Sequence, residues 1–261
     1  MHPRRKFLIK STMATTALLA VKPMQSIAKS GGSLSFQFSN DSISFLHTQN
    51  ISDNLANMIA SGNMNCRHKY SLLFDTGHTP SHSAVQNLGY HAILPNAKET
   101  THRTTQVASN LKAGNNDQAE NIHPYKIIYK GNVKIGVVGA VGHPTDQTEK
   151  NTLNEVNLVA ELLKTKHHCN LVVCISNLGY SNKNNIDDKT LAAESVFLDV
   201  IIGNRTDVDY KKSSAVVLNK NKSEVILNYT NESDVMIGNL QIGFDEAGNK
   251  NKISFSNVAM A

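Results

Sequence analysis

The sequence predicts an α/β fold, in which strands and helices alternate along the chain. Short apolar runs typical of buried strands recur between residues 42 and 203, and segments with helical spacing of apolar residues separate them. The chain has 261 residues, of which 40% are hydrophobic, so it can bury a substantial core. After Gly203 the strands follow one another directly through turns rich in Asn, Lys, Gly and Asp, which indicates an antiparallel β region on the same core.

The individual elements follow from the spacing of the apolar residues. Helices are expected at residues 54–60 and 153–164, where apolar residues recur at intervals of three or four. Strands are expected wherever a short run is rich in Val, Ile, Leu or Phe and is bounded by turn residues. The expected strands are residues 42–48, 70–75, 126–129, 133–141, 170–176, 198–203, 215–218, 224–229, 235–244 and 252–255.

The first 28 residues have the pattern of an export signal. Paired arginines at positions 4 and 5 are followed by a moderately apolar run at residues 13–21 and by a small-x-small cleavage pattern. The paired arginines resemble a twin-arginine signal, and an ordinary secretory signal is the alternative. The apolar run is shorter than the ~20 residues that a transmembrane helix needs. We therefore expect a signal at residues 1–28 and one soluble domain at residues 29–261, periplasmic or secreted, with no membrane span in the mature form.

Charge and cysteine content exclude two further classes of protein. The formal net charge of +5 comes from the first 28 residues, which contain basic but no acidic side chains, because the remainder carries 21 basic and 21 acidic residues. This balance predicts that nucleic acid is not a partner of the mature chain. Cys66, Cys169 and Cys174 are too few, and odd in number, for a disulfide framework.

Six short segments at the ends of expected strands form an ordered series. They are FLHTQN at 45–50, LLFDTGH at 72–78, LGYHA at 88–92, KIGVVG at 134–139, VVCISNLGY at 172–180 and DVIIGNRTD at 199–207. In this order and spacing they resemble the N-terminal domain of the bacterial 5′-nucleotidase branch of the calcineurin-like metallophosphoesterases, over roughly residues 43–244. The resemblance implies a central β-sandwich flanked by helices, which is the four-layer fold of that family, with functional side chains beyond the carboxyl ends of the strands.

Members of this family hold two divalent metals at the strand ends. Carboxylates, imidazoles and an amide oxygen fix the metals, which generate the attacking hydroxide and clamp the phosphate. At the corresponding positions of this sequence, no position keeps the residue that the family uses there. The Asp-x-His pair falls on Asn50 and Ser52, the bridging Asp on His78, the Asn-His pair on Ala97 and Lys98, a lone His on Asn177, and the last two His on Arg205 and Asp207.

These substitutions predict the loss of metal-dependent hydrolysis. Metal binding lowers the pKa of water from 15.7 to about 7, which is on the order of 10 kcal/mol of nucleophile activation. We expect no cofactor beyond, at most, one weakly held divalent ion such as zinc. His78 and Asp207 are its strongest remaining ligands, with His47 and the amide side chains at the strand ends as weak ones. Lys98 and Arg205 favour a phosphate or sulfate anion at the same place.

Three functions remain open for such an exported protein. The first is a catalytically inactive pseudo-phosphatase that binds a phosphate-containing small molecule or a cell-envelope protein. The alternative is an active hydrolase of phosphate esters or nucleotides with a remodelled metal site. Asp75 and His78 have the residue types of an acid–base pair, but no nucleophile motif accompanies them. The third is a purely structural cell-envelope protein. The sequence contains neither a Gly-x-Ser-x-Gly motif nor a Gly-rich phosphate loop. Neither of these two signals therefore points to another class of enzyme.

Overall fold

The structure is a computed structural model of the chain. The expected export signal at residues 1–28 lies outside the residues that it describes. The described residues are 42–49, 51, 56–57, 70–77, 88–95, 105–111, 122–142, 149–181, 186–204, 213–230, 236–246 and 248–259.

Two mixed β-sheets make up the centre of the molecule. The seven-stranded sheet has the order β13 (Lys250–Ala259), β12 (Met236–Phe244), β1 (Ser42–Thr48), β2 (Ser71–Asp75), β3 (Ala92–Ile93), β4 (Gln106–Val107) and β5 (Ile122–His123). The six-stranded sheet has the order β10 (Ser214–Leu218), β11 (Glu224–Tyr229), β9 (Val200–Gly203), β8 (Leu171–Ser176), β7 (Val133–Ala140) and β6 (Tyr125–Lys130).

The strands at the centre of each sheet are parallel, and the antiparallel pairs lie toward the edges. Strands β1 to β5 are successively parallel, as are β7, β8, β9 and β11. The antiparallel region expected after Gly203 is present in the pairs β10–β11 and β12–β13, but it is divided between the two sheets. Strand β11 pairs in parallel with β9, and β12 pairs antiparallel with β1.

The two sheets pack face to face around one apolar core, which confirms the expected sandwich. Side chains alternate along each strand, so Val173 and Ile175 of β8 face the other sheet, where Phe45 and Phe74 stack with ring centroids 6.3 Å apart. At one place the backbones themselves touch. A Cβ on Gly139 of β7 would overlap the carbonyl group of Val107, and Gly139 O accepts a hydrogen bond from Ser109 N at 2.8 Å.

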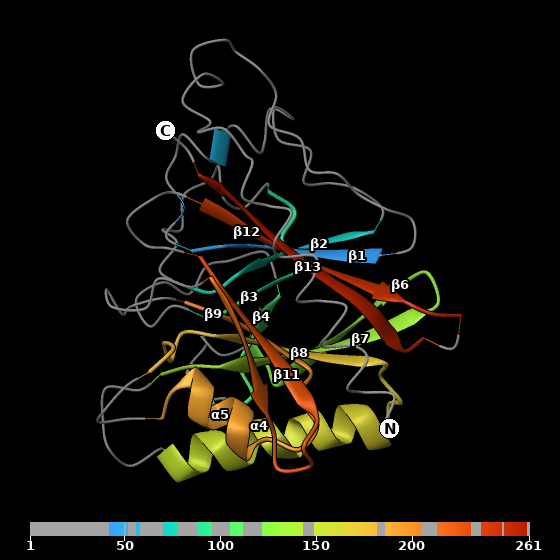
Figure 1. The fold of residues 1–261 in the computed structure, drawn as a ribbon. Helices are drawn as coiled ribbons and strands as arrows, with labels where there is room; N and C mark the ends of the chain where they lie inside the picture. Colours follow the sequence, from blue (N-terminus) through green and yellow to red (C-terminus); the bar gives the residue numbers. More distant parts are fainter. Residues whose placement is uncertain are drawn as a thin grey trace.

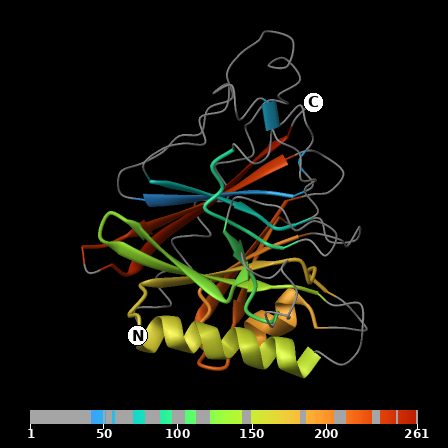
Figure 2. The same cartoon turned by 180° about the vertical axis from the view of Figure 1, so that it is seen from behind.

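Two helices cover the outer face of the six-stranded sheet, as Figures 1 and 2 show from opposite sides. Helix α4 (Glu149–Thr165) contains the predicted helix 153–164 and begins four residues earlier. Its Leu163 packs onto Gly136 of β7, where a Cβ would lie 2.8 Å from the leucine side chain. Helix α5 (Asp188–Glu194) was not predicted, because seven residues give little periodicity; Asp187 caps it by accepting a hydrogen bond from Thr190 N at 2.6 Å. The predicted helix 54–60 is described only at residues 56–57, which are helical.

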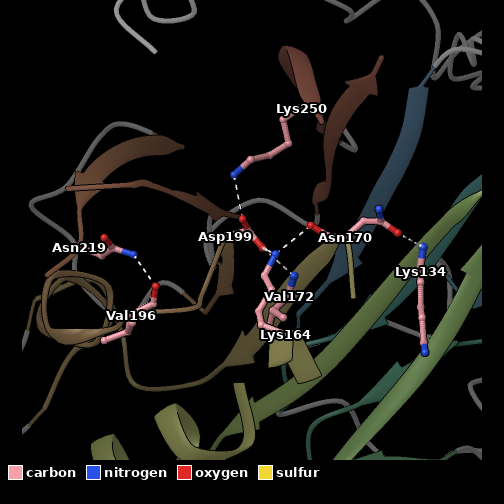
Figure 3. Close-up of polar contacts among 8 residues, drawn as sticks. All are labelled: Lys134, Lys164, Asn170, Val172, Val196, Asp199, Asn219 and Lys250. Atoms are coloured by element: carbon pink, nitrogen blue, oxygen red, sulfur yellow. Dashed lines mark hydrogen bonds and ion pairs between the residues drawn. The ribbon is translucent and has the colours of Figure 1, made fainter. Parts of the chain in front are cut away.

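An ion-pair cluster joins elements at the amino ends of β8 and β9 (Figure 3). Asp199 lies 2.7 Å from Lys164 of α4 and 3.1 Å from Lys250 of β13, and it also accepts a hydrogen bond from Val172 N at 2.8 Å. Lys164 also donates to Asn170 O at 2.8 Å. Burial alone would raise the pKa of Asp199, but the two ammonium groups and the Val172 amide outweigh it and hold that pKa below its usual value. The cluster therefore ties α4 and β13 to the six-stranded sheet.

Among the helices in the described part of the chain, none is long and apolar enough to cross a membrane.

Candidate functional site

The carboxyl ends of the central strands of both sheets meet at one end of the sandwich. Thr230, after β11, donates a hydrogen bond to Gln49, after β1, at 3.2 Å. A Cβ on Gly77, after β2, would lie 3.9 Å from Nδ2 of Asn177, after β8. Ligands of such folds gather beyond strand carboxyl ends, so this is the candidate site. We call it the strand-end site, and its described members are Thr48, Gln49, Asp75, Gly77, Gly142, Asn177, Asn204 and Thr230.

Asn177, at the position of the family's lone His, is the residue among the eight former metal-ligand positions that the structure describes. Its main-chain N–H donates to Ala140 O at 3.2 Å, and its side-chain Oδ1 accepts a hydrogen bond from Gly142 N at 2.6 Å. The side chain thus connects the end of β8 to the end of β7. The amide oxygen is the atom that could bind a metal, and it already accepts the hydrogen bond from Gly142 N.

Asp75 contributes a carboxylate to the strand-end site, but both of its oxygens accept hydrogen bonds locally. Oδ1 accepts from Gly77 N at 2.8 Å and Oδ2 accepts from the Thr48 hydroxyl at 2.8 Å. The hydroxyl groups of Thr48 and Tyr90 lie 2.6 Å apart in the same buried network. Gly77 has a φ of +99°, a left-handed conformation that glycine adopts readily. Asp75 therefore holds the turn that leads from β2 into the site.

His47 lies between the sheets, directly below the strand-end site. Its Nε2 is 2.6 Å from Oδ1 of Asn228, whose Nδ2 donates to Ser213 O at 3.2 Å. Because the Asn228 oxygen accepts, Nε2 carries the proton and Nδ1 is the lone-pair nitrogen, which has no hydrogen-bond partner among the described residues. Burial lowers the pKa of His47 to about 4, although the Asn228 hydrogen bond opposes the shift. His47 therefore cross-links β1 and β11 as a neutral imidazole.

Seven of the predicted site positions lie outside the described residues: Asn50, Ser52, His78, Ala97, Lys98, Arg205 and Asp207. Their described chain neighbours Gln49, Gly77 and Asn204 lie at the ends of β1, β2 and β9. Of the eight positions that correspond to the family's metal ligands, the structure therefore describes Asn177.

The donors that the structure describes do not by themselves form a two-metal centre. Such a centre needs several carboxylates and imidazoles around two cations about 3.5–4 Å apart. In the described ranges, no three His, Cys, Asp or Glu side chains come together. The carboxylate of Asp75 accepts hydrogen bonds from Gly77 and Thr48, and the amide oxygen of Asn177 accepts one from Gly142.

A buried acid that the sequence pattern did not reveal lies under the strand-end site. Asp188 is completely buried and accepts a hydrogen bond from the Ser176 hydroxyl at 2.5 Å. Burial raises the pKa of Asp188 to about 7, although the hydrogen bond from Ser176 and the nearby Tyr229 hydroxyl counteract part of the shift. The Asp187–Asp188 pair at a helix start was the available signal in the sequence, because one aspartate caps the helix and leaves the other to face the sheet.

No protein-family model and no curated protein sequence matches this chain. Solved structures do match. A 5′-nucleotidase precursor from Thermus thermophilus aligns with a TM-score of 0.64 and 18% identity, over 84% of this chain and 54% of that chain. An NAD nucleotidase from Haemophilus influenzae aligns with a TM-score of 0.61 and 14% identity, over 82% of this chain and 49% of that chain. A hypothetical protein from Thermus thermophilus aligns with a TM-score of 0.55 and 10% identity, over 84% of this chain and 100% of that chain.

The chain spans about half the length of the two nucleotidases that it matches. At these identities the matches establish the fold, whereas the chemistry depends on the residues at the site. The two packed mixed sheets, and α4 and α5 on the outer face of one of them, agree with the architecture that the resemblance implies. This chain has the calcineurin-like metallophosphoesterase fold.

Proposed function

We propose that this chain is an exported pseudo-phosphatase: a metallophosphoesterase fold that binds a phosphate-containing ligand at the strand-end site without hydrolysing it. The observation that carries the proposal is Asn177. It stands at the position of the family's lone His, and its amide oxygen accepts a 2.6 Å hydrogen bond from Gly142 N. The Asn177 side chain therefore joins the chain after β7 to the chain after β8, at a position where a metal-dependent phosphatase would have an imidazole.

The loss of hydrolysis follows from the chemistry that the substitutions remove. The attacking hydroxide of this fold family forms on bound metal, and the residues at the corresponding positions are now mostly amides, cations and small side chains. His78 and Asp207 are the strongest metal ligands that remain, and two strong ligands fall short of the three that a catalytic zinc site usually has. We therefore propose at most one weakly held ion such as zinc.

The choice of an anionic ligand follows from Lys98 and Arg205. Both stand at positions where the family binds metal cations, so positive charge is retained there by side chains. Arginine binds phosphate through two parallel hydrogen bonds, whereas lysine acts as a compact charge. A phosphate group on a small molecule or on a cell-envelope component would satisfy both. Export through the signal at residues 1–28 would deliver the protein to the periplasm or the cell exterior, where it could meet such a ligand.

A calorimetric titration with inorganic phosphate tests the proposal. We expect the wild-type chain to bind phosphate, and Arg205→Ala to weaken binding by about tenfold or more, because a charge-assisted hydrogen bond contributes roughly 1.5–3 kcal/mol. Lys220→Ala is the matched control, because Lys220 is an exposed lysine that pairs with Glu194. Equal binding by wild type and Arg205→Ala would refute the anion site.

Assays with nitrophenyl phosphate and nucleotide monophosphates, in the presence of manganese, zinc or cobalt, test the loss of hydrolysis. We expect no turnover above background. Turnover that a chelator abolishes and that added metal restores would instead establish the alternative function, a hydrolase with a remodelled site.

A further inference from the structure

A directed chain of hydrogen bonds leads from the strand-end site to the buried acid Asp188. The main-chain N–H of Leu178 donates to Oγ of Ser176 at 3.1 Å. Because that oxygen accepts from Leu178, its own proton points to Oδ1 of Asp188, 2.5 Å away. Leu178 directly follows Asn177. A change at the carboxyl group therefore reaches the strand-end site through two hydrogen bonds.

The same carboxyl group touches the ends of two further strands. A Cβ on Gly203, the last residue of β9, would overlap both Oδ2 of Asp188 and the ring of Tyr229, the last residue of β11. Asn204, which follows Gly203, donates its N–H to Ser176 O at 3.0 Å. Asp188 thus fills the space beneath the ends of β8, β9 and β11, from which the loops of the site depart.

The surroundings of Asp188 contain no described cation that would balance its charge. The titratable groups that face it are the Tyr229 hydroxyl from β11, the Cys174 thiol from β8 and the carboxylate of Asp187 before α5. The pKa of the Cys174 thiol reflects the proximity of Asp188: burial raises it most, and the neighbouring Asp188 carboxylate raises it further. Asp188 itself has no ion-pair partner among the described residues. Within this part of the chain, an ionised Asp188 would therefore be stabilised by hydroxyl groups or by water that enters.

We propose that Asp188 is a positioning residue with a proton-dependent action: its ionisation changes the hydrogen bond that Ser176 donates to it and places an unpaired negative charge beneath the ends of β8 and β9, so that the site binds anions less tightly as the pH rises through neutrality. The proton passes to solvent, and the negative charge left beneath the site both admits water and repels an anionic ligand. The part that concerns the ligand rests on the proposed function.

The first arm of the test needs no ligand. Two-dimensional NMR follows the amide signals of Leu178 and Asn204 from about pH 5.5 to pH 8.5. We expect both to move with one shared midpoint near neutrality in wild type, and to lose that movement in Asp188→Asn, which keeps the shape and an acceptor for Ser176. His123→Gln is the control, because His123 is an exposed titratable residue at the edge of the other sheet. A titration that persists in Asp188→Asn would overturn the proposal.

Ser176→Ala gives a second variant should Asp188→Asn fail to fold. It removes a hydrogen bond that favours the ionised carboxylate, so the shared midpoint should move to higher pH. An unchanged midpoint would contradict the assignment of the titration to Asp188.

The second arm measures sulfate binding by calorimetry, because the charge of sulfate does not change in this range. We expect the affinity of wild type to fall about fivefold or more between pH 6 and pH 8, and that of Asp188→Asn to stay nearly constant. Equal pH dependence in both proteins would overturn the coupling. Failure of sulfate to bind at either pH would refute the proposed anion site, while the amide titration would still decide the positioning role.

Discussion

Protonation of His47 should destabilise the fold in acid, because this imidazole is buried between the sheets in its neutral form. In the unfolded chain a histidine takes up a proton near pH 6.5, whereas burial lowers the pKa of His47 to about 4 in the folded protein. The unfolded state therefore binds more protons between these values. The stability that His47 contributes is complete above about pH 6.5 and is lost as the pH falls toward 4. This lowering of the His47 pKa corresponds to roughly 3 kcal/mol in the free energy of unfolding.

The substitution His47→Gln isolates this effect. The glutamine Nε2 can take the place of the imidazole Nε2 and donate to Oδ1 of Asn228, but it does not titrate. At pH 7.5 we expect the variant to be less stable by about 1–2 kcal/mol, because its buried carbonyl oxygen has to find a donor. Toward pH 4 the difference should move by about 3 kcal/mol in favour of the variant. Gly238, opposite His47 in β12, has no Cβ that would obstruct the new side chain.

Urea unfolding followed by circular dichroism, at a series of pH values, measures the free energy of unfolding of both proteins. The comparison between variants is essential, because burial and two neighbouring lysines also lower the pKa of His91 to about 4, and this contribution is common to both. His123→Gln, at an exposed position, is the control and should follow the wild-type curve. Parallel curves for wild type and His47→Gln would refute the reasoning.

Three further predictions concern the ion-pair cluster, the contact between sheets and export. Asp199→Asn should lower the free energy of unfolding by about 3 kcal/mol, because two lysine ammonium groups lose their counter-charge; an unchanged urea midpoint would contradict this. Gly139→Ala should lower the free energy of unfolding by about 2 kcal/mol or more, because the new Cβ would overlap the Val107 carbonyl. Gly142→Ala should lower it less, because the nearest atom to its new Cβ, Oδ1 of Asn177, would be 3.5 Å away. Replacing Arg4 and Arg5 with lysine should retain the precursor in the cytoplasm, and cell fractionation that finds normal export would point to the general secretory route.

The longer strands could be predicted because burial on both faces makes them continuously apolar. Strand β8, Leu171–Ser176, is buried at every position, and the sequence predicts it within one residue. Strands β3 and β4 have two residues each, too short for any periodicity, and only the neighbouring strands hold them in the sheet. The partners of β11 could not be predicted, because a pattern of successive strands does not show in which sheet each one lies.

In the candidate site, too, local sequence predicts some features and not others. The location of Asn177 after a strand could be predicted, because the apolar run before it ends at Ser176. The contact of Ser176 with Asp188 joins residues 12 apart, and Tyr229 reaches the same place from another strand. Local sequence carries no signal for such contacts, because they depend on the packing of α5 against the sheet.

The central proposal is that this chain, which has the metallophosphoesterase fold, does not form the two-metal centre of that family. Elemental analysis of the purified protein tests it most directly, after incubation with zinc and manganese and removal of free metal by desalting. We expect less than one tightly bound ion per chain, because the side-chain oxygens of Asp75 and Asn177 accept hydrogen bonds within the protein and His78 and Asp207 are the strongest ligands left. Two metal ions retained per chain would contradict the account.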